Sequence, residues 1–176
     1  MHKLSILSLL IATTFSFGVS ASTGTITFTG EITASTCDVD IDGNGPSATI
    51  TMPTISAANL DADAKTAGDT AFYISLSNCT GILKTASAFF EAGTNVNTNG
   101  RLTNTGSAKN VDIQLLDVTK NSSVINIGSP EQINNAGYVD VAGGSALVPY
   151  ISRYYATGKS DPGTVQTAVT YSIQYK

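Results

Sequence analysis

Charged residues, histidine and tryptophan are scarce in this 176-residue chain. Asp, Glu, Lys and Arg together form only 12% of the sequence, tryptophan is absent, and the only histidine is His2. Nucleic-acid binding usually requires basic side chains clustered in one patch, whereas the nine Lys and Arg residues are scattered along the chain. The composition therefore argues against a nucleic-acid-binding protein.

Long hydrophobic runs are also lacking, with one exception at the N-terminus. Lys3 precedes an apolar stretch from Leu4 to Val19, and Val19-Ser20-Ala21 has the small-residue pattern of a signal-peptidase site. Ser and Thr residues interrupt the stretch, which is shorter than the roughly 20 apolar residues of a membrane span. We therefore expect residues 1–21 to be a signal peptide. The exported part, residues 22–176, has thirteen acidic and eight basic residues.

Residues suited to catalysis are lacking in the exported part. His2 lies in the leader, so the exported chain has no imidazole for general-base work or for a nucleophilic triad. No two acidic residues stand in a recognisable acid–base setting. The sequence therefore predicts a protein that is not an enzyme and that needs no cofactor.

Cysteine is limited to Cys37 and Cys79, both in the exported part. An even number of cysteines in an oxidising compartment indicates a disulfide. Neither a CxxC pair nor a cluster of metal ligands accompanies them, which argues against a redox or metal site. We expect a structural bond with a Cα separation of about 4.4–6.8 Å. The loop that it closes implies a stabilisation of about 4 kcal/mol at most.

One segment resembles part of a calcium-binding loop. Asp38 to Gly43 reads D-x-D-x-D-G, the first half of a helix-flanked ligand pattern. The twelfth position of that pattern requires a bidentate Glu, and here it is Thr49. Val39 and Ile41 instead alternate with the acidic residues, as core residues of a strand do. We therefore expect no metal site.

Alternation of apolar and polar residues with period two runs through most of the exported chain, which is typical of strands. It is clearest in Phe72–Ser77 and Val111–Leu115, and clusters of Asn, Asp and Gly separate the candidates. Only Ala57–Thr66 is compatible with a helix, and we expect a loop with a turn or two there. Many short strands without a helical period predict one all-β domain, a sandwich or a barrel. The other strand candidates are Ala48–Met52, Ala86–Glu91, Ser122–Ile127 and Ala146–Ala156.

The last fourteen residues form a strand candidate without an obvious neighbour. Apolar and aromatic residues alternate there with Thr, Ser and Gln, and no turn or further strand follows in the sequence. A strand left uncovered at a sheet edge invites pairing by another chain. The alternating apolar residues are Val169, Tyr171, Ile173 and Tyr175.

A second unpartnered strand candidate, Thr25–Ile32, directly follows the leader. Ile26, Phe28 and Ile32 lie on one face, and Thr or Glu residues lie on the other. One end of the chain therefore lacks a strand and the other carries a spare one, which predicts a protein that assembles. The alternative for Ile26 and Phe28 is that they begin a core strand of their own domain.

These segments resemble the pilin subunits of chaperone–usher fimbriae, and the resemblance extends over the whole exported chain. It is closest to the major subunits of type 1 and G-type fimbriae. Gly163 is the fourteenth residue from the end and Tyr175 the penultimate one, as in the C-terminal signature of that family. The short stretch before Cys37 is shared by G-type major subunits and type 1 minor subunits. The other similar segments are Gly24–Cys37, Phe72–Cys79, Asn110–Asp117, Pro149–Gly158 and Tyr171–Tyr175.

The resemblance implies an incomplete immunoglobulin-like β-sandwich, completed by a donor strand from another subunit. Residues 22–32 would be the donor strand and residues 33–176 the pilin domain. A periplasmic chaperone and an outer-membrane usher are the implied assembly partners, and a fimbria on the cell surface is the implied location. The donor residues would be Ile26, Phe28, Gly30 and Ile32. The residues of the groove for chaperone and donor would be Gly163, Val169, Tyr171, Ile173, Tyr175 and Lys176.

Other functions remain as alternatives to a structural fimbrial subunit that polymerises head to tail. A minor or adaptor subunit would have the same fold. A secreted β-sandwich carbohydrate-binding module would use the same all-β architecture. A tip adhesin of this family carries an additional binding domain, and residues 22–176 leave no room for one.

Overall fold

The computed structural model describes residues 25–30, 32, 34 and 36–176. The predicted signal peptide, residues 1–21, lies outside the described residues. The chain divides into two compact units, residues 1–32 and residues 33–176. The described residues of the first unit belong to no helix or strand.

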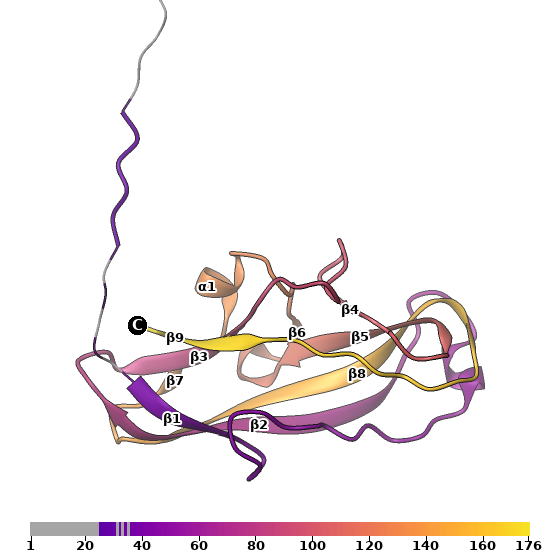
Figure 1. Ribbon diagram of the computed structural model, residues 1–176, viewed down its shortest axis with the longest axis horizontal. Coiled ribbons are helices and arrows are strands. Elements are labelled where there is room, and N and C mark those ends of the chain that lie inside the picture. Colours follow the sequence, from indigo (N-terminus) through magenta and orange to yellow (C-terminus); the bar gives the residue numbers. More distant parts are fainter. Residues whose placement is uncertain (1–24, 31, 33, 35) are drawn as a thin grey trace, which may run out of the picture. The chain divides into compact units, whose positions relative to one another are not determined.

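The larger sheet of the second unit is antiparallel, with the strand order β1-β2-β8-β5-β4 (Figure 1). Its two longest strands, β2 (Thr66–Thr80) and β8 (Ala146–Asp161), pair along most of their length. β6 (Ser123–Val124) pairs with β5 beside this path. The remaining strands are β1 (Thr36–Ile41), β4 (Leu102–Thr103) and β5 (Lys109–Asp117).

The smaller sheet has three antiparallel strands in the order β7-β3-β9. They are β7 (Val139–Asp140), β3 (Thr85–Phe90) and β9 (Tyr171–Tyr175). The helical elements are all short, and no helix in the described part of the chain is long and apolar enough to cross a membrane. They are α1 (Gln132–Asn135) and the 3₁₀ turns η1 (Ala57–Leu60) and η2 (Val118–Lys120).

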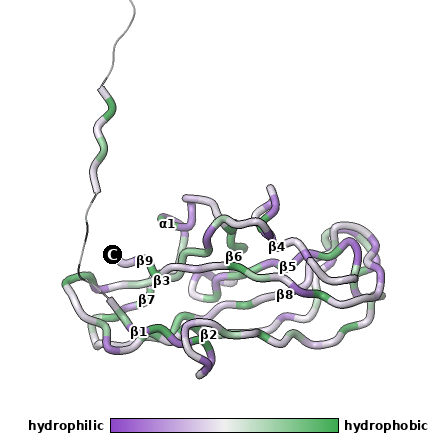
Figure 2. The backbone as a smooth tube through the Cα atoms, viewed as in Figure 1, coloured by the Kyte–Doolittle hydropathy of each residue, from purple (hydrophilic) through white to green (hydrophobic). Residues whose placement is uncertain are grey.

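The main hydrophobic core joins the inward faces of the two sheets. Tyr150 of β8 is fully buried, with Phe72 of β2 stacked on its ring and Phe90 of β3 edge-on to it. Its hydroxyl also accepts a hydrogen bond of 3.0 Å from the N–H of Ala88 on β3. Figure 2 shows hydrophobic residues along the strands and hydrophilic ones mainly in the turns. One aromatic side chain therefore connects the two sheets.

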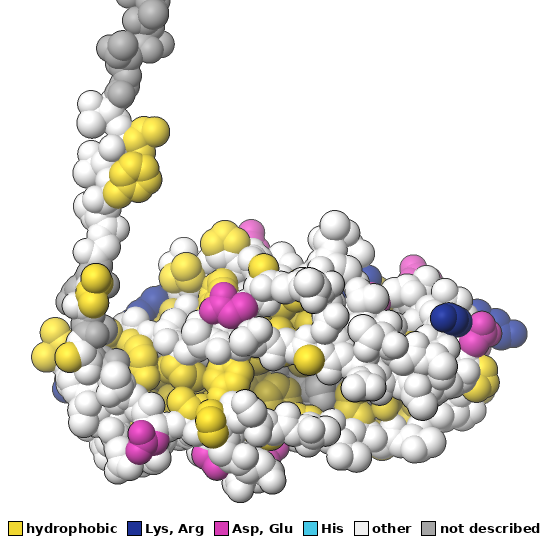
Figure 3. Space-filling view, viewed as in Figure 1, with side chains coloured by type: hydrophobic (Ala, Val, Ile, Leu, Met, Phe, Trp, Pro, Cys, Tyr) yellow, Lys and Arg dark blue, Asp and Glu magenta, His cyan; other side chains and the backbone are white. Residues whose placement is uncertain are grey.

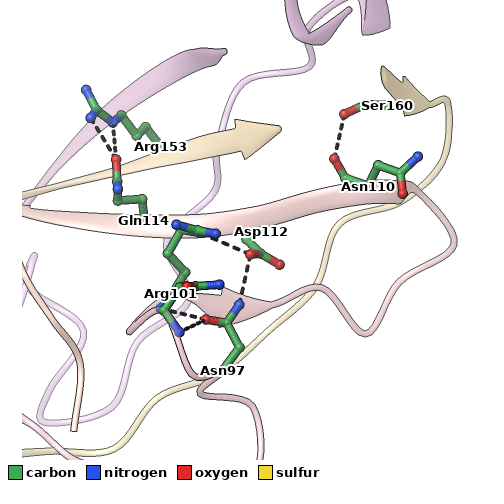
Figure 4. A network of polar contacts seen from close by, with 8 residues as sticks. Asn97, Arg101, Asn110, Asp112, Gln114, Arg153 and Ser160 are labelled. Atoms are coloured by element: carbon green, nitrogen blue, oxygen red, sulfur yellow. Dashed lines mark hydrogen bonds and ion pairs between the residues drawn. The ribbon is translucent and has the colours of Figure 1, made fainter. Parts of the chain in front are cut away.

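Polar side chains buried on β5 form a second network, which Figure 4 shows. The Asp112 carboxylate pairs with the Arg101 guanidinium at 3.1 Å and accepts a hydrogen bond of 2.8 Å from the Asn97 side chain. The Gln114 side-chain oxygen accepts two hydrogen bonds from Arg153 of β8. Buried polar groups require partners of this kind. These contacts therefore give the buried polar groups of β5 partners within the sheet and its neighbouring loop.

The all-β prediction is confirmed, and most strand candidates lie within observed strands. Phe72–Ser77, Ala86–Glu91, Val111–Leu115 and Ala146–Ala156 fall on β2, β3, β5 and β8. As expected, the segment from Ala57 is a loop that contains the short 3₁₀ turn η1 and a second turn, and Thr66 already begins β2.

One strand prediction was wrong and two were too long. Ala48–Met52 is in no strand, because in the described structure no neighbouring strand pairs with it. Within Ser122–Ile127, only Ser123–Val124 form a strand opposite β5; Ile125 donates one more backbone hydrogen bond to Leu115 of β5, and Ile127 directs its N–H to the C=O of Gly100 instead. At the C-terminus the strand begins at Tyr171, so Val169 precedes it.

Candidate functional site

In the described part of the chain, strand β9 has a neighbouring strand at one edge only. It pairs with β3 from Tyr171 opposite Phe90 to Tyr175 opposite Ala86, and it ends the strand order of the smaller sheet. Lys176 and Thr85 exchange two backbone hydrogen bonds of 2.9 Å. Hydrogen-bonding direction alternates along an antiparallel strand. The N–H and C=O groups of Tyr171, Ile173 and Tyr175 therefore point to the edge where the described residues provide no strand.

The segment from Pro46 to Pro53 has an alternating pattern but no ladder. Ala48, Ile50 and Met52 are half-buried against the core, and the residues between them are exposed. Among the described residues, nothing hydrogen-bonds to the backbone of residues 47–52. This segment is therefore a second unpaired stretch of backbone.

Two tyrosine side chains connect β9 to the β1 side of the domain. The Tyr171 hydroxyl donates a hydrogen bond of 2.8 Å to the C=O of Pro46. The Tyr175 hydroxyl accepts one of 3.0 Å from the N–H of Cys37. Burial raises the pKa of Tyr171, and the negative charge of Asp40 raises it further. β9 is therefore joined to β1 and to the segment after it by two tyrosine hydroxyls, and not by a backbone ladder.

Hydrophobic side chains cover the region between these two stretches of backbone. They are half-buried and pack against the main core, and most of the residues between them are exposed. Figure 3 shows hydrophobic side chains gathered in a band across this face. We call this set the apolar strip: Val39, Ala48, Ile50, Met52, Val165, Val169, Tyr171, Ile173 and Tyr175.

The disulfide lies at one end of the apolar strip. Cys37 and Cys79 are bonded at an S–S distance of 2.06 Å, and the Cα atoms are 4.1 Å apart. The predicted bond is thus present, with a Cα separation just below the expected range. Because the bond attaches the start of β1 to the end of β2, it fixes the backbone N–H that Tyr175 contacts.

The predicted donor residues are exposed in this structure. Ile26 is 78% exposed, Phe28 89% and Ile32 102%. A Cβ atom at Gly30 would have no atom within 4 Å.

Gly163 lies at the start of the C-terminal segment, close to the backbone of Ser107 and Ala108. A Cβ atom there would lie 2.3 Å from the backbone nitrogen of Ala108 and 2.7 Å from the carbonyl carbon of Ser107. Next to it, the N–H of Ala108 donates to the C=O of Thr164 at 3.0 Å. Glycine is required because two backbones approach closely here. The structure therefore places Gly163 before the apolar strip, where it positions the chain leading to β9.

The partial calcium-loop motif is a turn that stabilises itself. The Asp40 carboxylate accepts hydrogen bonds from the N–H groups of Gly43 and Gly45, and the Asp42 carboxylate accepts one from Tyr73. No group of three acidic, His or Cys side chains in the described part of the chain is arranged to hold a metal ion. Within this motif Asp40 therefore stabilises the turn after β1, and Asp38 and Asp42 bond to β2, Asp38 accepting from the Asn78 side chain at 2.8 Å.

Two parts of the site do not follow from the sequence. The alternation in Ala48–Met52 predicts an ordinary strand, whereas the segment lies without a ladder between Pro46 and Pro53. The cross-contacts of the Tyr171 and Tyr175 hydroxyls had no sequence signal, because their acceptor and donor are backbone groups more than a hundred positions away.

Known structures include one with the same fold. The P pilus rod subunit PapA matches with a TM-score of 0.59 at 10% identity, over 79% of this chain and 99% of PapA. At this identity the match establishes the fold alone, and it confirms the pilin-like β architecture.

Sequence relatives and a family profile identify the family. The profile of the type 1 fimbrial protein A family, FimA, matches residues 52–176. The major fimbrial subunit SMF-1 of Stenotrophomonas maltophilia is 37% identical over 89% of this chain and 94% of its own length. The F17 fimbrial protein of Escherichia coli is 33% identical over the full length of both chains. This chain therefore belongs to the FimA family of chaperone–usher fimbrial subunits, and it is a non-enzymatic structural subunit of a surface fimbria.

Proposed function

We propose that this subunit polymerises by strand donation, in which residues 22–32 of one subunit pair with the free edge of β9 in the next. The observation that carries the proposal is the match between the two surfaces. β9 presents unpaired backbone groups beside the apolar strip, and Ile26, Phe28 and Ile32 are exposed and alternate with polar residues. Backbone pairing gives affinity in such additions, and alternate side chains give specificity.

The geometry of a strand fits this pairing. Ile26, Phe28, Gly30 and Ile32 are two residues apart, so an extended segment directs all four to one face. Each large side chain contributes roughly 1.5–3 kcal/mol when it is transferred from water to an apolar surface. Gly30 suits a place where the donor backbone passes close to the acceptor.

Donor and acceptor are different surfaces of the subunit, so the contact is head-to-tail. Such contacts produce open filaments when the rotation between copies does not close. This is consistent with the polymerisation that membership of the pilin family implies.

Before polymerisation, the free edge of β9 needs protection, because unpaired edges promote aggregation. We infer that a periplasmic chaperone supplies a temporary strand there, and that an outer-membrane usher is the place of exchange. The support for both partners is the family to which the chain belongs. We also infer that the subunit forms the shaft, because its relative SMF-1 is a major subunit.

A peptide-binding experiment tests the strand assignment. The exported chain, residues 22–176, is refolded with and without a synthetic peptide of residues 22–32, and thermal unfolding is followed by circular dichroism. We expect saturating peptide to raise the Tm by several degrees, since bound ligand stabilises the folded state. The matched control is the same peptide with Phe28→Asp, which should have little effect. If the unmodified peptide leaves the Tm unchanged, the strand assignment is wrong.

A further inference from the structure

Two hydrogen bonds cross the apolar strip from β9. The Tyr171 hydroxyl donates to the C=O of Pro46 at 2.8 Å, and the Tyr175 hydroxyl accepts from the N–H of Cys37 at 3.0 Å. We call these two contacts the cross-strip hydrogen bonds. In the described part of the chain, β9 pairs only with β3 and β1 only with β2. Apart from apolar packing, the two sides of the strip are therefore joined by tyrosine hydroxyls.

The Cys37 end of these contacts is fixed to the larger sheet. Cys37 belongs to β1, which pairs with β2, and it is covalently bonded to Cys79 near the end of β2. A backbone N–H that is held by both a ladder and a disulfide keeps a constant position. The Tyr175 hydroxyl therefore bonds to a rigid point on the opposite side of the strip.

The Pro46 end is fixed by the turn after β1. The Asp40 carboxylate accepts hydrogen bonds from the N–H groups of Gly43 and Gly45. Because Gly45 directly precedes Pro46, this clamped turn determines where the Pro46 carbonyl lies. The acidic turn thus provides the second rigid point, which the Tyr171 hydroxyl contacts.

Tyrosine hydroxyls hold the unpaired segment from Pro46 to Pro53 at both of its ends. Tyr171 of β9 bonds to the C=O of Pro46, and Tyr154 of β8 donates a hydrogen bond of 3.1 Å to the C=O of Pro53. Residues 47–52 between them have no backbone partner among the described residues. The segment therefore keeps its position relative to β9 without being paired to any strand.

The length of a tyrosine side chain matches the space that a donor strand needs. Neighbouring strands lie about 4.7–4.9 Å apart, so a strand between two edges separates them by about 9–10 Å. A tyrosine side chain with a hydrogen bond at its hydroxyl spans a comparable distance, because the hydroxyl is at the far end of the ring from the backbone. Both rings pack against the main core, so they cross on the core side and leave the backbone edge of β9 open.

The two sides would approach each other if nothing held them apart. The strip between them is only half-buried, and further burial of apolar surface is favourable. A closed strip has no room for the large donor side chains Ile26, Phe28 and Ile32. Contacts of fixed length across the strip oppose this closure.

We propose that Tyr171 and Tyr175 are positioning residues for strand addition, because the cross-strip hydrogen bonds hold β9 apart from β1 and from residues 47–52 by the width of one donor strand. The acceptor is then open before the donor arrives. The inference rests on the proposed function, since the donor is the strand for which the space is held.

The first test separates the association rate of the donor from its dissociation rate. The exported chain, residues 22–176, and the variants Tyr171→Phe, Tyr175→Phe and the double variant are refolded and mixed with a fluorescent peptide of residues 22–32 in a stopped-flow instrument. Phenylalanine keeps the ring and removes only the hydroxyl. A smaller open fraction weakens the apparent affinity by the same factor.

We expect slower association with an unchanged dissociation rate. Each single variant should associate about fivefold more slowly, the equivalent of one typical hydrogen bond. The two tyrosines are about 13 Å apart along the strand, so their effects should multiply to about 25-fold in the double variant.

The second test measures the separation of the two sides and needs no donor. Nitroxide labels are placed on cysteines introduced at Thr49 and Ala168, which are both exposed. Thr49 follows Pro46 by three positions and Ala168 precedes Tyr171 by three, so the labels lie on opposite sides of the strip. Electron paramagnetic resonance should give a shorter mean label distance in the double variant than in the chain with both tyrosines.

Tyr138→Phe is the matched control. The Tyr138 hydroxyl donates a hydrogen bond of 2.8 Å to the C=O of Ile133, the same type and length as the Tyr171 contact, but it does not cross the strip. Its loss should leave the association rate and the label distance unchanged.

The outcomes are distinguishable from those of the proposed function. An unchanged association rate and an unchanged label distance in the double variant would overturn the inference. Faster dissociation alone would also overturn it, because the hydroxyls would then act only in the bound state. If the chain with both tyrosines binds no peptide, the proposed function fails, and the label distance still decides whether the hydroxyls hold the two sides apart. Should the double variant not fold, the single variants provide the same comparison.

Discussion

The hydroxyl of Tyr175 accepts a hydrogen bond of 3.0 Å from the backbone N–H of Cys37, although the two residues are 138 positions apart. Cys37 is the residue bonded to Cys79, and Tyr175 is the last residue of β9. The contact therefore connects the disulfide, the start of β1 and the free edge of β9. At the disulfide end of the apolar strip, this hydrogen bond fixes the distance between β9 and β1.

Phe28→Asp should abolish polymerisation while the subunit still accumulates in the periplasm. Phe28 is 89% exposed, so a carboxylate there does not disturb the folded subunit, but it would be buried in an apolar acceptor. Electron microscopy of cells and immunoblots of periplasmic extracts provide the two measurements. Thr27→Asp, on the opposite face of the segment, is the control and should be much milder. Loss of the Phe28→Asp subunit from the periplasm would favour a core role for this residue.

Tyr175→Ser should lower the periplasmic level of the subunit more than Tyr175→Phe. Phenylalanine retains the apolar ring and loses the bond to Cys37, a change of about 1 kcal/mol. Serine also loses the packing of the ring against the main core. Immunoblots of periplasmic fractions measure the difference. Equal, normal levels of both variants would show that this side chain is dispensable for capture and folding.

Gly163→Ala should destabilise the subunit by about 1–3 kcal/mol, the usual range for overpacking. Its Cβ would lie 2.3 Å from the nitrogen of Ala108, and backbone cannot move away as a flexible side chain can. The control is Gly143→Ala, because a Cβ there has no atom within 4 Å. Denaturant unfolding of the peptide-bound subunit measures both. Similar midpoints for the two variants would contradict the close approach.

Stability should fall as the pH rises above about 10, the usual pKa of tyrosine. Burial raises the pKa of Tyr150, so the folded state keeps this proton at a pH where the unfolded state has lost it. The folded state then binds more protons, which makes the free energy of unfolding decrease with rising pH. Tm values measured across this range should fall less steeply for Tyr150→Phe, which cannot ionise. Parallel curves for both proteins would exclude Tyr150 as the cause.

The sequence by itself determined the β character of the domain and the residues of its disulfide. It also predicted one strand without a neighbour near each end of the chain, at Thr25–Ile32 and in the last fourteen residues. These features are local or compositional: period two marks the buried face of a strand, and two cysteines in an exported chain allow one bond. Phe72–Ser77 was predictable for this reason, and so was Val111–Leu115 as a strand, although the structure buries its polar face, with Asp112 and Gln114, as well.

Tertiary structure alone decided which segments face each other. Ala48–Met52 has the alternation of a strand, yet no strand lies beside it in the described structure, because pairing depends on neighbours distant in sequence. The same holds for Gly163, whose steric reason is the backbone of Ser107 and Ala108, and for Lys176, whose partners are Lys84, Thr85 and Ile133. An alternating pattern records which face of a strand is buried, but only the packed fold determines what lies at its edge.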